Sequence, residues 1–152
     1  MHRVTARVLP VNATGEVLLL HGWDPALPEA PFWFSVGGAG EPGESLAEAA
    51  ARELFEETGI RVASADLGEP IYLEVGAEFD WGEFHLVQDQ HYFAVAVAGD
   101  VVVDFGGLEP LEVGTIDAAA WWTADALEAD GRASNEVLPE AMRSAVAAVG
   151  AR

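Results

Sequence analysis

The sequence contains no cysteine and no lysine, and nowhere does it hold a long run of apolar residues. Without cysteine the chain has no disulfides, no thiolate metal ligands and no thiol nucleophile. A membrane-spanning helix needs about 20 consecutive apolar residues, so none is expected, and arginines interrupt the amino-terminal stretch where a signal peptide would be apolar. We therefore expect a cytoplasmic protein.

Basic residues are also scarce, since 7 arginines stand against 26 aspartates and glutamates and give a net charge of −19. A surface for polymeric nucleic acid needs clustered basic residues that neutralise phosphates, and this composition argues against one. A small nucleotide is still allowed, because a bound metal ion inverts the local charge of a pocket. With 51% hydrophobic residues, the length of 152 residues predicts one domain over residues 1–152.

The most strongly predicted element is a helix over residues 46–58. Ser45 and Glu48 form the S-x-x-E pattern of a capping box, strong helix formers follow, and Gly59 stands at the C′ position. Leu54 and the apolar residues one and two turns before it recur at helical spacing and should face the core.

Three glutamates crowd the end of this helix. Glu53, Glu56 and Glu57 stand at i, i+3 and i+4, so their carboxylates share one face near the negative end of the helix dipole. Each is disfavoured there by roughly 0.3–1 kcal/mol, and only Arg52 offers local compensation. Oxygen ligands on one rigid face favour a hard divalent cation, Mg²⁺ or Mn²⁺, which shares its coordination with substrate phosphates. The alternative is an ordinary solvated acidic face.

The stretch from Gly38 to Ile60 resembles the Nudix box, G-x5-E-x7-R-E-U-x-E-E-x-G-U, in which U is apolar. The match is complete at Gly38, Glu44, Arg52, Glu53, Leu54, Glu56, Glu57, Gly59 and Ile60. The resemblance implies an α+β Nudix fold, an α/β/α sandwich with a mixed central sheet and a loop-helix-loop element. It also implies a metal-dependent hydrolase of nucleoside diphosphate derivatives, with a small nucleotide as substrate and a homodimer as a plausible assembly.

By the same resemblance, Glu53, Glu56 and Glu57 are the metal ligands, and Arg52 and Glu44 orient them. Nudix proteins commonly draw a further acid from a loop outside the box as general base or extra ligand. The loop over residues 104–114 offers Glu112 first and Glu109 second, against the alternative of a charged loop.

One departure from the family pattern lies just before the box. Family members often have proline before the paired glycines, where this chain has Val36. Valine relaxes the fixed φ of that turn and removes no ligand, so it bears on the geometry of the loop. Gly37 and Gly38 allow close approach of the backbone to a ligand.

The remaining candidate site residues lie on strands. Residues 3–11 and 16–21 predict a β-hairpin, on which Arg7 is either a phosphate contact or a solvated strand arginine. Trp33, in the short aromatic strand 32–36, either lines the cleft or belongs to the core.

Further strands are predicted at 61–62, 71–75, 91–97 and around 121–122. An irregular segment is expected at 79–86 and a terminal helix at 135–149. In the closing segment, Thr123 is expected to cap a short helix.

Two other functional classes fit parts of the pattern. A Nudix-fold sensor that binds a nucleotide without turnover would normally have lost ligands, and this box has lost none. An isoprenoid diphosphate isomerase relies on a catalytic cysteine, which is absent. The secondary marks of the ADP-ribose, dinucleoside polyphosphate, coenzyme A and NADH subgroups are not met, so the leaving group stays open.

Overall fold

The computed structural model describes residues 2–110 and 112–152. Their strands are β1 (His2–Val11), β2 (Val17–Gly22), β3 (Phe32–Phe34), β4 (Val36–Ala39), β5 (Tyr72–Trp81), β6 (Phe84–Ala96) and β7 (Ile116–Trp122). The helices are α1 (Leu46–Thr58), α2 (Ala124–Asp130) and α3 (Leu138–Gly150), with short 3-10 helices η1 (Ser64–Leu67) and η2 (Phe105–Gly107). No helix in these ranges is long and apolar enough to span a membrane.

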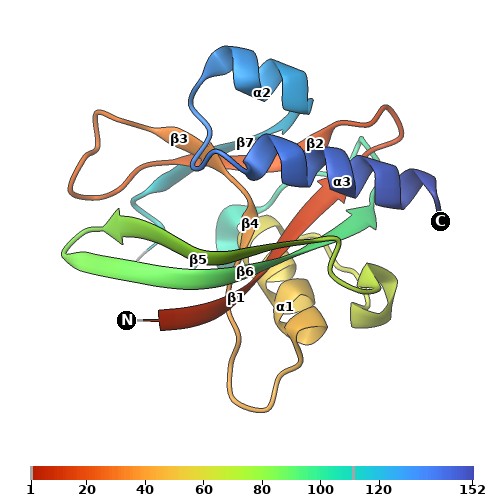
Figure 1. Ribbon diagram of the computed structural model, residues 1–152, viewed down its shortest axis with the longest axis horizontal. Coiled ribbons are helices and arrows are strands. Elements are labelled where there is room, and N and C mark those ends of the chain that lie inside the picture. Colours follow the sequence, from red (N-terminus) through yellow and green to blue (C-terminus); the bar gives the residue numbers. More distant parts are fainter. Residues whose placement is uncertain (1, 111) are drawn as a thin grey trace.

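The strands form one mixed sheet in the order β3-β2-β1-β6-β5, with β4 paired to β1 and β7 paired to β2. Strands β1 and β6 run parallel over ten paired positions, whereas the other pairs are antiparallel. Strand β1 therefore lies at the centre, and β6 is interior as its apolar sequence predicted. Figure 1 shows α1 on one side of β1 and β6, and α3 on the other side.

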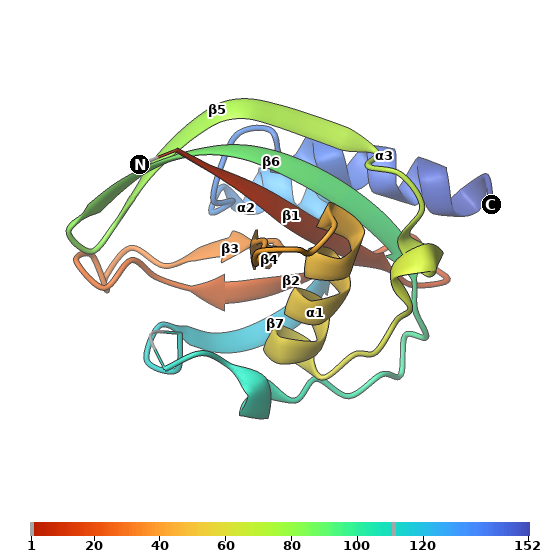
Figure 2. The ribbon, with the colours of Figure 1, turned by 90° about the horizontal axis from the view of Figure 1, so that it is seen from below.

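Each side of the sheet has its own core, because alternate residues of a strand point to opposite faces. Ala6 and Val8 of β1 pack with Leu54 of α1, while Leu9 packs with Met142 of α3. Figure 2 shows α1 in front of the sheet and α3 behind it. The predicted α/β/α arrangement around a mixed sheet is thus confirmed.

The predicted boundaries of α1 are confirmed at both ends. The Ser45 side chain accepts a hydrogen bond from the Glu48 backbone N–H, and the Glu48 carboxylate accepts one from the Ser45 N–H (2.9 Å). Gly59 closes the helix in the left-handed conformation, with φ 77°. Thr123 likewise caps α2, as expected.

Three predictions about other segments are wrong. Residues 61 and 62 form no strand, because the chain runs from α1 directly into η1. The segment 79–86 is a tight hairpin between β5 and β6, built on Gly82 with φ 61°. The terminal helix begins at Leu138, where the Asn135 side chain accepts its N–H.

Candidate active site on the loop and acidic helix

The paired glycines are held by the central strand. In the β1–β4 ladder Gly37 lies opposite Arg7, and Val36, buried in the core, lies opposite Val8. Gly37 has φ 151°, and a Cβ there would lie 2.8 Å from Arg7 Cα, so only glycine fits. Valine at position 36 therefore begins a regular strand that carries the glycines into the site.

Both glycines are in contact with glutamates of α1. The Gly37 N–H donates to Glu57 Oε1 at 2.7 Å. A Cβ on Gly38 would lie 2.5 Å from Glu53 Oε1, so the absence of a side chain there makes room for the Glu53 carboxylate. The glycine strand and the acidic face of α1 thus form one continuous wall.

Arg52 organises the glutamates around it. Its Nε and Nη2 donate to the two oxygens of Glu44, at 2.7 and 3.0 Å, in a bidentate pair. Its Nη1 donates to Glu53 and to Glu56, both at 3.1 Å, and its Nη2 also donates to the Ala39 carbonyl at 3.2 Å. The hydrogen bond from Arg52 lowers the pKa of Glu44 below its ordinary value. Arg52 therefore links Glu44, Glu53 and Glu56, and its orienting role stays a prediction.

Two of the carboxylates have raised pKa values, so their ionised form is unfavourable in the fold. Burial, with smaller contributions from the charges of Glu56 and Glu112, raises the pKa of Glu53 to about 7 against the opposing effect of Arg52. Glu57 is only 1% exposed, and burial followed by the charges of Glu112 and Glu53 raises its pKa well above the ordinary value. Buried anions need a compensating charge, so these carboxylates favour a positively charged neighbour.

Glu112 is brought to the site from a distant part of the chain. The loop before β7 contacts the end of α1, where the Asp104 N–H donates to the Thr58 carbonyl at 2.8 Å, and the charge of Glu112 raises the pKa of both Glu53 and Glu57. Glu112 Oε1 accepts the Glu109 N–H at 3.0 Å, which fixes the turn that presents it. Glu112, the first of the two loop acids proposed from the sequence, thus raises the pKa of two helix glutamates.

Arg7 acts electrostatically on one glutamate of the acidic wall. Its charge acts on Glu57, its Nε donates to Gln90 Oε1 at 3.0 Å, and its Nη1 donates to the Ser35 carbonyl at 3.3 Å. Arg3, four residues earlier on the same face of β1, acts on Glu53 in the same way. Sequence reasoning missed Arg3, although its spacing from Arg7 on an alternating strand was the available signal.

Trp33 packs on the α2 and α3 side of the sheet. Its ring centroid lies 5.2 Å from that of Trp122 and 4.7 Å from that of His21, within the second core cluster. These contacts agree with the core alternative for Trp33. A role for Trp33 in substrate binding stays a prediction.

No three His, Asp or Glu side chains within residues 2–110 and 112–152 are arranged as a formed ion site. Arg52 Nη1 donates to both Glu53 and Glu56, so these two carboxylates face the guanidinium group. The donor set suits a hard cation by its chemistry, since it consists only of carboxylate oxygens, and the buried Glu57 has a raised pKa.

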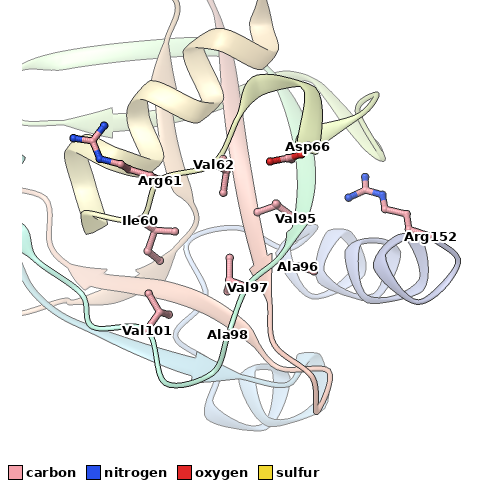
Figure 3. Close-up of a pocket in the computed structure, with 10 residues that line it drawn as sticks. All are labelled: Ile60, Arg61, Val62, Asp66, Val95, Ala96, Val97, Ala98, Val101 and Arg152. Atoms are coloured by element: carbon pink, nitrogen blue, oxygen red, sulfur yellow. The ribbon is translucent and has the colours of Figure 1, made fainter.

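A cavity of about 450 Å³ lies beyond the end of α1 (Figure 3). It is lined mainly by aliphatic side chains, with Arg61, Asp66 and Arg152 at its margin. None of the helix glutamates lines it. The acidic wall and this cavity are therefore separate parts of the surface.

The domain combines a mixed sheet with a loop-helix-loop element, in which the glycines of β4 contact the glutamates of α1. The chain belongs to the Nudix family, since the family model for the NUDIX domain matches residues 1–141. The predicted family is thus confirmed over most of the chain.

Two curated relatives match parts of the chain. A Bacillus subtilis (strain 168) protein, named provisionally as an 8-oxo-dGTP diphosphatase, is 41% identical over 69 residues, which cover 45% of this chain and 43% of that protein. An RNA pyrophosphohydrolase of Erythrobacter litoralis (strain HTCC2594) is 35% identical over 91 residues, 53% of this chain and 54% of that protein. The matches thus span about half the length of these relatives.

Solved structures agree over nearly the whole chain. The E. coli dihydroneopterin triphosphate pyrophosphohydrolase has a TM-score of 0.63 at 21% identity, covering 98% of this chain and 99% of that chain. The MutT protein of Methanosarcina mazei Go1 has a TM-score of 0.62 at 22% identity, covering 93% and 91%. At these identities the likeness shows the fold.

Proposed function

We propose that the protein hydrolyses the diphosphate linkage of a nucleoside diphosphate derivative with a divalent metal ion, Mg²⁺ or Mn²⁺. The observation that carries this proposal is the buried Glu57 beside the partly buried Glu53, two carboxylates whose raised pKa values show that the protein itself does not fully neutralise them. A divalent cation held by these residues would compensate both charges and neutralise substrate phosphates. The diphosphatase and pyrophosphohydrolase names of the two relatives support the same reaction class.

In this proposal Glu53, Glu56 and Glu57 hold the metal, which would supply charge neutralisation for the phosphates and acidify a bound water. Arg52 and Glu44 position the ligands through the bidentate pair and the bonds to Glu53 and Glu56. The hydrogen bond from Gly37 fixes the rotamer of Glu57. The glycine backbone then leaves room for a phosphate group close to the wall.

A water molecule that attacks phosphorus needs a nearby base. Glu53, whose pKa burial raises to about 7, is suited to accept a proton near neutral pH. Glu112 is the second candidate, because its charge acts on both helix glutamates from the opposite loop. Arg7, half-buried beside Glu57, is proposed as a phosphate contact, with the backbone of Gly37 and Gly38 as the neighbouring surface.

The test is a panel of nucleoside triphosphates, nucleotide sugars, ADP-ribose and dinucleoside polyphosphates, assayed with Mg²⁺ and with Mn²⁺ for release of phosphate or monophosphate. The proposal expects turnover of at least one class that EDTA abolishes. Tight nucleotide binding with no turnover on any substrate would support the rival function, a sensor without catalysis. A single domain over 1–152, a cytoplasmic location and a homodimer remain predictions of the sequence.

A further inference from the structure

A chain of side-chain hydrogen bonds crosses the sheet from β5, at the end of the strand order, to the strand that carries the glycines. Glu74 Oε1 on β5 accepts from Gln90 Nε2 on β6 at 2.6 Å. Gln90 Oε1 in turn accepts from Arg7 Nε on β1 at 3.0 Å. Arg7 Nη1 then donates to the Ser35 carbonyl, just before β4 begins, at 3.3 Å. The chain therefore connects four successive segments of the fold.

The register of the strands explains why these side chains meet. Glu74 lies directly opposite Gln90 in the antiparallel β5–β6 pair, and Gln90 lies opposite Thr5 in the parallel β1–β6 pair. Arg7 stands two residues after Thr5, so it points to the same face of the sheet. The three side chains therefore share one face, and Gln90, in the middle, is only 5% exposed.

The Arg7 end of this chain lies against the candidate site by direct contact. Arg7 is opposite Gly37 in the β1–β4 ladder, and a Cβ on Gly37 would lie 2.8 Å from Arg7 Cδ. The same glycine donates its N–H to Glu57 Oε1 at 2.7 Å. One residue of the glycine strand thus contacts both the Arg7 side chain and a glutamate of α1.

The two charged neighbours of Gln90 fix the orientation of its amide. A guanidinium group only donates hydrogen bonds, and a carboxylate only accepts them. Gln90 therefore turns its oxygen to Arg7 and its NH2 group to Glu74. The reversed amide would place donor against donor and acceptor against acceptor. Glu74 thus holds Gln90 in the one orientation that binds Arg7.

The hydrogen-bond partners of Arg7 in this chain are neutral oxygens. An amide and a backbone carbonyl occupy two of its five N–H donors, and neither cancels its positive charge. Within residues 2–110 and 112–152, the Nη2 donors of Arg7 have no hydrogen-bond partner, and the side chain is half-buried. Arg7 therefore has a fixed direction and keeps both charge and donors for a ligand.

We propose that Gln90 and Glu74 are positioning residues of the reaction, which act through Arg7. Gln90 holds the guanidinium group against the glycine strand, and Glu74 holds the Gln90 amide. The inference rests on the proposed function, in which Arg7 contacts a substrate phosphate, and it adds the residues that aim this contact. A carboxylate at position 90 would hold Arg7 as well but would neutralise it, so the neutral amide is what suits the arrangement to an anionic ligand.

The first test follows hydrogen exchange of the Arg7 Nε–H by NMR in EDTA, without substrate, and Arg7→Gln assigns the signal by its loss. Gln90→Leu should speed this exchange at least 10-fold and Glu74→Leu several-fold. Glu74→Gln keeps an acceptor for Gln90 and should restore the wild-type rate. Glu78→Leu is the matched control on the same strand, because its carboxylate lies 3.5 Å from His85, and it should change the rate less than about 2-fold. Glu74 is partly exposed, so Glu74→Leu decides the test if Gln90→Leu does not fold.

The second test exchanges the two side chains in the double variant Glu74→Gln/Gln90→Glu, which keeps both the composition and the net charge. The Arg7 Nε–H should stay protected, because the carboxylate at position 90 accepts it. KM for the best substrate of the panel with Mg²⁺ should nevertheless rise about 10-fold, with kcat changed less than about 2-fold, because Arg7 is now neutralised.

Wild-type exchange rates in both leucine variants would overturn the positioning role. A wild-type KM in the folded double variant would overturn the role of the neutral amide. If wild type turns over no substrate, the proposed function fails, and the exchange rates alone decide whether Gln90 and Glu74 position Arg7.

Discussion

Replacing Glu53 by glutamine should stabilise the metal-free protein at alkaline pH. The side chain is 13% exposed, and burial raises its pKa from 4.5 to about 7. At about 1.4 kcal/mol per pKa unit, keeping this carboxylate ionised in the fold costs about 3 kcal/mol. Glutamine keeps the shape and an acceptor for Arg52, so the variant should recover most of that free energy of unfolding.

The sign of the pH dependence follows from the raised pKa. The folded state favours the protonated carboxyl, so wild-type stability is lost as pH rises from 4.5 through about 7, and the penalty is complete above that. The difference between Glu53→Gln and wild type should therefore be near zero at pH 4.5 and largest at pH 8. For a chain of this length, about 3 kcal/mol corresponds to a melting temperature higher by roughly 6–12 °C.

The assay is urea unfolding in EDTA at pH 4.5, 6 and 8, repeated at pH 8 with added Mg²⁺. Glu69→Gln, an exposed loop position with the same change of charge, should shift stability by less than about 0.5 kcal/mol. Added Mg²⁺ should stabilise wild type and leave Glu53→Gln nearly unchanged, because a ligand stabilises only the state that binds it. A difference that is constant from pH 4.5 to pH 8 would refute the reasoning.

Three further substitutions separate the site from its scaffold. Gly38→Ala would place a Cβ 2.5 Å from Glu53 Oε1, so we expect turnover to fall at least 10-fold, whereas Gly40→Ala, whose Cβ meets only a methyl at 3.7 Å, should retain it in the same assay. Ser45→Ala removes the helix cap and should lower the free energy of unfolding by about 1 kcal/mol in urea titrations, with kcat nearly unchanged; a large loss of kcat would contradict a purely structural cap. Arg52→Lys loses the bidentate pair, so KM for Mg²⁺ should rise several-fold in metal titrations, and an unchanged value would show that Arg52 does not orient the ligands.

The helix of the site was predictable because its limits are set by local rules. Ser45 caps the first turn and Gly59 ends the last one, and both signals stand in the sequence itself. The resemblance of residues 38–60 to a family motif then identified the acidic face. The mixed sheet followed from the same resemblance, and the strand pairing agrees with it.

Other features depend on contacts between distant residues. The β5–β6 hairpin was missed because a bulge near Gly76 breaks the alternation and a two-residue turn at Gly82 leaves little loop signal. The deep burial of Glu57 depends on the register that places Gly37 beside it, which no local pattern encodes. The hydrogen bond from Arg7 to Gln90 likewise depends on the parallel register that brings β1 beside β6.

The central claim is that Glu57 serves a metal ion in hydrolysis and is not merely a buried structural acid. The most direct measurement compares kcat of wild type and Glu57→Gln on the best substrate of the panel with Mg²⁺, after circular dichroism has shown both to be folded. The account predicts a loss of well over 10-fold, because a lost metal ligand costs more than the ~1.4 kcal/mol that a tenfold change represents. A folded Glu57→Gln variant that keeps more than about a tenth of the wild-type rate would contradict it.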